Sequence, residues 1–167
     1  MSRPADERRE IVVRVGDWAV DREAGTLAAL GLGSCVAIML YDPVARAGGM
    51  AHVLLPSATL SRDQSNPAKF PETAVPFLVS RLGALGADPR RLVAKLAGGA
   101  SMFGQLMAPG TVHMGERNVV AARLALQGAG IPVVREAVGG ERGRSIRFHL
   151  EDGRVEVWRV GADVAVL

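Results

Sequence analysis

Two side chains in the first third of the sequence have the chemistry of a nucleophile and its base. Cys35 is the only cysteine and ends the glycine-rich stretch Gly-Leu-Gly-Ser-Cys at residues 31–35, and His52 follows seventeen residues later. A glycine-rich turn leaves a thiol little shielded and leaves backbone N–H groups free beside it. A histidine within reach could take the thiol proton and produce a thiolate nucleophile. This pattern is typical of a cysteine hydrolase.

A structural role is the alternative for Cys35, because free cysteines are among the most buried residue types and pack like small apolar side chains. Gly31 and Gly33 favour a catalytic role for Cys35 instead, since glycine weakens a strand unless a bulge or a closely approaching ligand requires it. A redox-sensing thiol would also explain an accessible Cys35, but it gives His52 no role. The hydrolase interpretation therefore ranks first and the redox sensor last.

Two predicted strands must position the two side chains. Residues 35–41 and 49–55 are apolar runs of strand length, and the first is bounded by the turn dipeptide Asp42-Pro43. An antiparallel pairing around a loop of residues 41–46 joins them into a hairpin.

The register of this hairpin decides whether the thiol and the imidazole meet. With that loop, Leu40 pairs with Ala47 and Cys35 lies opposite His52. Directly opposed residues share a face, with Cβ atoms about 4.5–5.5 Å apart. A slip of one residue would move the histidine to the other face. In the predicted register, we expect an imidazolium to pair with the thiolate and to lower the pKa of the thiol.

Several motifs resemble the chemoreceptor glutamine deamidase family, CheD. They begin with residues 31–35, continue with Tyr-Asp-Pro at residues 41–43, and include Gly-Gly-Met-Ala-His-Val-Leu-Leu-Pro at residues 48–56. The later matching segments are Lys69-Phe70 with Thr73-Ala74-Val75, residues 95–103, residues 115–118, and Gly139-Gly140 with residues 142–145. Because the segments occur in order over about residues 11–150, the combination is far more specific than any one motif.

The resemblance implies that Cys35 is the nucleophile and His52 its base, with no metal or organic cofactor. Family members carry a threonine six residues before the cysteine, whereas this sequence has Ala29. A group that accepts the second N–H of the histidine fixes its tautomer and orientation. Thr26, Ser34 or a main-chain carbonyl could replace the missing hydroxyl. Backbone N–H groups near Ser34 and Cys35 are the candidate oxyanion donors.

The implied activity is conversion of glutamine side chains on the cytoplasmic helices of chemotaxis receptors to glutamate, through a thioester on Cys35. A binding module is the alternative. In that case a site weakened at Ala29 has lost turnover, and the protein still docks to receptors or to a chemotaxis phosphatase of the CheC type. Retention of Cys35 and His52 favours the enzyme.

Composition excludes several other classes of protein. The net charge of +3 arises from basic residues interspersed with acidic ones, so the sequence lacks the basic stripe of a nucleic-acid binder. We expect no membrane insertion and a cytoplasmic protein, since there is no apolar run of 18 residues and the polar start is unlike a signal peptide. Cysteine and histidine lack the close spacing of a metal site.

The length of 167 residues and the 49% apolar content fit one domain with a sizeable core. We expect a disordered lead over residues 1–10, followed by one α/β or α+β domain over residues 11–167 with mixed sheets packed with helices. The predicted helices span residues 72–85, where Pro76 removes one intrahelical bond or shortens the first turn, and 116–127. The other predicted strands span residues 11–15, 91–97, 131–138, 145–150 and 155–160, with a hairpin turn at residues 151–154.

Overall fold

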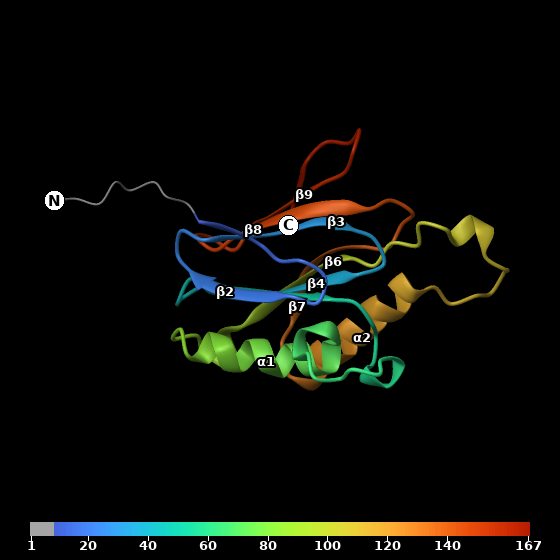
Figure 1. Cartoon of the computed structure of the whole chain (residues 1–167). Helices are drawn as coiled ribbons and strands as arrows, with labels where there is room; N and C mark the ends of the chain where they lie inside the picture. Colours follow the sequence, from blue (N-terminus) through green and yellow to red (C-terminus); the bar gives the residue numbers. More distant parts are fainter. Residues whose placement is uncertain (1–8) are drawn as a thin grey trace.

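The computed structural model describes residues 9–167 and folds them into three layers (Figure 1). Two five-stranded sheets lie face to face, and two helices cover the free face of one of them. The predicted disordered lead, residues 1–10, lies outside the described residues except for its last two positions, and Glu10 begins the first strand. The predicted α/β domain with mixed sheets and helices is confirmed.

The central sheet lies between the outer sheet and the helices. Its strands, in spatial order, are β2 (Trp18–Arg22), β5 (Ala47–Val53), β4 (Val36–Asp42), β6 (Val93–Gly98) and β7 (Val133–Val138). The outer sheet contains, in order, β1 (Glu10–Val12), β3 (Thr26–Leu32), β8 (Arg144–His149), β9 (Val155–Trp158) and β10 (Ala165–Val166). The helices are α1 (Pro71–Gly83) and α2 (Met114–Gly128), and short 3-10 turns span Ala58–Leu60, Pro67–Lys69, Pro89–Arg91 and Gly104–Leu106.

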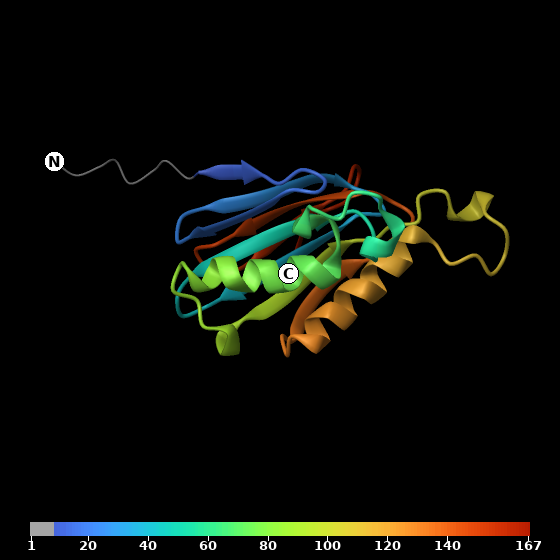
Figure 2. The same ribbon diagram turned by 60° about the horizontal axis from the view of Figure 1, so that its bottom comes forward.

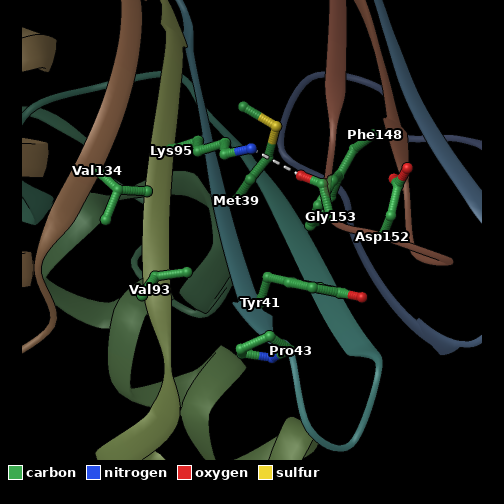
Figure 3. A pocket seen from close by; sticks show the side chains of 9 residues that line it. All are labelled: Met39, Tyr41, Pro43, Val93, Lys95, Val134, Phe148, Asp152 and Gly153. Atoms are coloured by element: carbon green, nitrogen blue, oxygen red, sulfur yellow. Dashed lines mark hydrogen bonds between the residues drawn. The ribbon is translucent and has the colours of Figure 1, made fainter.

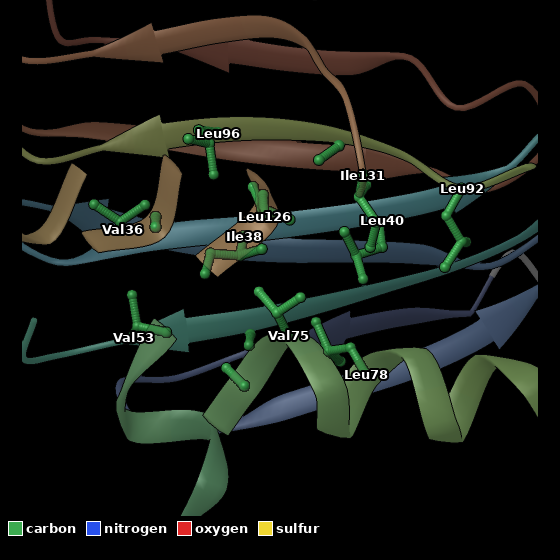
Figure 4. Packing of buried hydrophobic residues seen from close by; sticks show 14 of the residues in the cluster. Val36, Ile38, Leu40, Val53, Val75, Leu78, Leu92, Leu96, Leu126 and Ile131 are labelled. Atoms are coloured by element: carbon green, nitrogen blue, oxygen red, sulfur yellow. The ribbon is translucent and has the colours of Figure 1, made fainter. Parts of the chain in front are cut away.

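Strand β4 is buried on both faces, which explains its continuous apolar sequence. Val36, Ile38 and Leu40 point to the helices and pack there with residues of α1 and α2 (Figure 4). The alternate residues, among them Ala37 and Met39, point to the outer sheet and form a second core with its inner face. A side chain on this second face therefore lies in the layer between the two sheets.

The β4–β5 hairpin is present, but its predicted register is wrong by two residues. Leu40 pairs with Gly49 instead of Ala47, and His52 pairs with Ala37 instead of Cys35. The turn is shorter than predicted, because Asp42 continues the strand and pairs with Ala47. A shift of two residues keeps every side chain on its face, since the period of a strand is two.

The carboxylate of Asp42 explains the short turn. It is fully buried and accepts hydrogen bonds from the backbone N–H groups of Val44 and Ala45 inside the turn, at 2.9 and 3.1 Å, and from Asp88 N–H at 2.9 Å. The Arg91 guanidinium also binds it at 2.9 Å. These donors outweigh the effect of burial and hold the pKa of Asp42 far below its ordinary value. The Tyr-Asp-Pro motif thus stabilises a turn.

Both predicted helices are present, with slightly different ends. In α1, Pro71 begins the helix and the buried side chains of Ala74, Val75, Leu78 and Leu82 recur at helical spacing. Pro76 lies inside α1 and is exposed, so it removes one hydrogen bond without shortening the helix. Within residues 9–167, no helix combines the length and the hydropathy needed to cross a membrane.

The other predicted strands are present with ends that differ by at most three residues, and the turn at residues 151–154 joins β8 to β9. Three strands were not predicted: β2, β3 and β10. The sequence of β3 includes Gly31, and β2 has only five residues and ends with the charged Asp21 and Arg22. Both lack the long apolar run that identifies β4.

Lys95, in the motif of residues 95–103, ties the two sheets together (Figure 3). It projects from β6 into the layer between the sheets beside a cavity of about 220 Å³. Its ammonium group donates hydrogen bonds to the carbonyls of Gly153 and Leu167, each at 2.8 Å. Burial lowers the pKa of this lysine. Lys95 therefore links the central sheet to the β8–β9 turn and to the last residue described.

Candidate functional site

Cys35 and His52 both lie between the two sheets. Cys35 directly precedes β4 and belongs to the core that faces the outer sheet, and His52 lies on the same face of β5, two residues beyond Met50. Because His52 pairs with Ala37, Cys35 is its diagonal neighbour. Diagonal neighbours are about 7–8 Å apart, within reach of long side chains. The exposed fraction is 9% for Cys35 and 3% for His52.

A main-chain carbonyl orients the His52 ring. The Nδ1 atom lies 3.0 Å from the carbonyl oxygen of Val13. A carbonyl can only accept, so Nδ1 carries the proton and Nε2 carries the lone pair. Among the described residues, Nε2 has no hydrogen-bond partner, although it is buried. The ring therefore presents an unoccupied acceptor, which is the state required of a general base.

The segment that supplies Val13 is bonded to the backbone of His52 itself. Gly16 N–H donates to the His52 carbonyl at 2.9 Å, and His52 N–H donates to the Asp17 carbonyl at 3.0 Å. Val13 N–H in turn donates to the carbonyl of Ala28 in β3 at 2.7 Å. The carbonyl that orients the ring is thus fixed to both sheets.

The expected imidazolium–thiolate pair is not supported. Burial raises the pKa of the Cys35 thiol, and its own backbone N–H only partly opposes this effect. Burial also lowers the pKa of His52, against smaller opposing effects of the Val13 carbonyl and the Asp17 carboxylate. Desolvation disfavours the charged form of both groups. At neutral pH the resting site therefore holds a neutral thiol beside a neutral imidazole.

The backbone around the nucleophile leaves donors free. Gly33 and Cys35 use their carbonyls to accept hydrogen bonds from Ala100 and Gly99, each at 2.8 Å. No acceptor within residues 9–167 binds the N–H group of Ser34, and no carbonyl there binds that of Cys35. Such groups can stabilise an oxygen that becomes negatively charged in a transition state.

Glycine is required where the β6 end crosses behind Cys35. Gly98 has φ +109°, and a Cβ atom there would lie 2.2 Å from the Cys35 carbonyl oxygen. A Cβ atom at Gly115, in the first turn of α2, would lie 2.5 Å from the Ala100 carbonyl oxygen. The glycines of two family motifs therefore let α2 and the β6 end approach the nucleophile closely.

Asn118 belongs to this site, and the sequence analysis did not select it. It is fully buried in α2, and its Nδ2 donates to the carbonyls of Ser34 at 2.9 Å and Leu54 at 3.1 Å. Asn118 is the last residue of the motif at residues 115–118, which is the signal in the sequence that includes it.

The remaining sequence candidates lie as follows. Ser34 adjoins Cys35, and its hydroxyl has no hydrogen bond to the residues described. Thr26 is paired with His149 across β3 and β8, and its hydroxyl lies 3.5 Å from His149 Nδ1. The hydrogen bonds of the described residues do not join Thr26 to His52. Of the alternatives for orienting His52, the main-chain carbonyl is the one that contacts the ring.

A cysteine beside free N–H groups, with a histidine oriented as an acceptor, places this α/β domain in the class of candidate cysteine hydrolases. Residues 54–159 match the family model described as CheD chemotactic sensory transduction. The chain belongs to the CheD family.

Two named relatives illustrate the match. The chain is 44% identical over 155 residues to a probable chemoreceptor glutamine deamidase of Caldanaerobacter subterraneus subsp. tengcongensis, covering 92% of this chain and 96% of the relative. It is 43% identical over 150 residues to the chemoreceptor glutamine deamidase of Thermotoga maritima, covering 90% and 92%. A Neisseria meningitidis protein of family DUF152 shares the fold, with a TM-score of 0.51 at 13% identity, over 80% of this chain and 64% of that chain.

Proposed function

We propose that this chain is a chemoreceptor glutamine deamidase in which Cys35 is the nucleophile and His52 its general base. Full-length similarity to relatives with that name supports the activity. The observation that carries the assignment of residues is the free acceptor Nε2 of His52, which the Val13 carbonyl fixes on the face that carries Cys35.

The proposed reaction starts from a neutral Cys35 thiol and a neutral His52 imidazole. As the Cys35 sulfur attacks the carboxamide carbon of a receptor glutamine, His52 Nε2 takes the thiol proton. The N–H groups of Ser34 and Cys35 bind the oxygen that becomes negative. His52 then gives its proton to the leaving ammonia, and a thioester remains on Cys35. A water molecule, deprotonated by His52, hydrolyses the thioester to glutamate and restores the thiol.

A protein substrate fits the surface beside the nucleophile. The segment between β6 and α2 extends from the body of the molecule (Figures 1 and 2). It exposes large apolar side chains, with exposed fractions of 70% for Phe103 and 85% for Leu106. Met102 of this segment lies next to Gly33 in the nucleophile turn. We propose that the segment contacts the apolar side of a receptor's cytoplasmic helix and brings a glutamine to Cys35.

The same surface could instead bind a chemotaxis phosphatase of the CheC type, which is the binding-module alternative. Mass spectrometry of a receptor cytoplasmic fragment incubated with the purified chain distinguishes the two functions. We expect conversion of particular glutamines to glutamates to increase with time, and no conversion with buffer alone. Binding of the fragment without conversion would instead support the binding module.

Replacing Ala29 with threonine, the residue of the family pattern, is not expected to accelerate deamidation. The proton on His52 Nδ1 already has an acceptor in Val13, and Ala29 is fully buried in the core that contains Cys35. Overpacking a core of this kind typically costs about 1–3 kcal/mol. We expect an unchanged or reduced rate and a lower melting temperature. The measurements are the deamidation rate and thermal unfolding.

Ala29→Ser is the matched control, because it adds the hydroxyl without the methyl group. A gain of about tenfold in either variant, the size of one strong hydrogen bond, would contradict the role of Val13.

A further inference from the structure

Asn118 connects the two segments that carry the candidate nucleophile and base. Its Nδ2 atom donates to the carbonyl of Ser34, one residue before Cys35, and to the carbonyl of Leu54, two residues after His52. Among the side chains of residues 9–167, Asn118 alone hydrogen-bonds to both segments. These two hydrogen bonds therefore influence the distance between the Cys35 thiol and the His52 imidazole.

This connection lies where the hairpin itself ends. The last pair of the β4–β5 ladder is Val36 with Val53. Beyond it the two segments bond to different neighbours, since Leu54 N–H donates to the Lys69 carbonyl and the Cys35 carbonyl accepts from Gly99 N–H. The ladder therefore does not hold Cys35 at a fixed distance from β5, and the amide of Asn118 spans the open end.

The two contacts determine the orientation of the Asn118 amide. Its NH₂ end faces two carbonyl oxygens, and the reversed amide would place an oxygen against both of them. Its Oδ1 atom is buried without a hydrogen-bond partner among the described residues. Buried side-chain polar atoms usually have a partner. The residue thus satisfies its donors at the site while its acceptor stays unpaired.

We propose that Asn118 is a positioning residue that holds Cys35 and His52 at the distance proton transfer requires. The proposal rests on the proposed function, in which His52 takes the proton of the Cys35 thiol. Asn118 lies in α2, so the helix layer sets the geometry of a site between the two sheets. A displacement of about 1 Å in such a pair can cost on the order of 100-fold in rate.

The test uses two substitutions and one control in the same helix. Asn118→Leu removes both donors at similar size, and Asn118→Ser keeps one shorter donor. Leu126→Ala removes fully buried contacts farther along α2, away from the site. All variants are measured below their melting temperatures.

For deamidation of a receptor fragment, we expect kcat to fall roughly 30- to 100-fold in Asn118→Leu and less in Asn118→Ser, with KM little changed. Leu126→Ala should lower the melting temperature and leave kcat unchanged. An equal loss of kcat in Leu126→Ala, or an unchanged kcat in a folded Asn118→Leu protein, would overturn the proposal.

A second readout does not depend on deamidation. The rate of Cys35 alkylation by iodoacetamide is measured across pH in the wild type, His52→Ala, Asn118→Leu and the double variant. If Asn118 holds the pair together, His52→Ala slows alkylation in the wild type and has little further effect in Asn118→Leu. Additive effects, or no effect of His52→Ala in the wild type, would overturn the proposal. A chain that fails to deamidate but shows this coupling would refute the proposed function alone.

Discussion

Cys35→Ala should lower the rate at which receptor glutamine is converted to glutamate by a factor on the order of 10⁴ or more. The sulfur forms the bond to the substrate, and no other cysteine exists in the chain to replace it. Cys35→Ser should be nearly as inactive, because a hydroxyl has a far higher pKa than a thiol and His52 must deprotonate it. Mass spectrometry of the receptor fragment measures both variants.

Thermal unfolding is the control for these two variants. Alanine removes one sulfur atom from a position that is 9% exposed, so we expect only a small change in melting temperature. Substantial turnover by either variant would remove Cys35 from the mechanism. A large loss of stability together with unchanged activity would establish the structural role that is the alternative for a buried cysteine.

His52→Gln should lower kcat/KM by about 10²- to 10⁴-fold, the usual contribution of a general base. In the wild type, protonation of His52 removes the acceptor, so activity falls as pH falls through the pKa of His52. Burial lowers that pKa, which places the acid limb of the pH profile below the ordinary value of about 6.5. In His52→Gln this limb should disappear, and the remaining rate should rise only at high pH, where the Cys35 thiol ionises, because burial raises its pKa.

Two results of this pH measurement would contradict these expectations. An acid limb clearly above about pH 6.5 would mean that the pKa of His52 is raised, as in an imidazolium–thiolate pair. An acid limb that stays at the same pH in His52→Gln would belong to a different group. The first result would contradict the neutral pair inferred from the burial of Cys35 and His52, and the second would contradict the role of His52 as the base.

The elements that carry the site could be predicted because their patterns are strong. The apolar run of β4 and the helical spacing in α1 reflect burial, because buried positions carry apolar residues. The register of the hairpin was missed because it depends on the Asp42 carboxylate, which bonds inside the turn and to residues 88 and 91. The short, partly charged strand β2 and the strand β3, which glycine interrupts, gave no comparable signal.

The candidate site was predictable only for the side chains that react. Cys35 and His52 could be found because their chemistry is rare and their spacing fits a hairpin. Asn118 lies 84 and 64 residues from the two carbonyls it binds, so spacing alone gave no indication of the contacts. The directions of the two pKa shifts depend on burial by the outer sheet, whose strand β3 was not predicted.

The partner of His52 Nδ1 has a consequence for how the sequence can change. A threonine that orients a catalytic histidine can be lost in a single substitution, whereas the Val13 carbonyl belongs to the backbone and is present whatever side chain stands there. The orienting group therefore does not depend on the chemistry of the side chain at residue 13, although the burial of Val13 limits its size and polarity. It is vulnerable instead to insertions or deletions between β1 and β2, which would move the carbonyl away from the ring. Evolutionary change between β1 and β2 is thus limited in the number of residues and not only in their side chains.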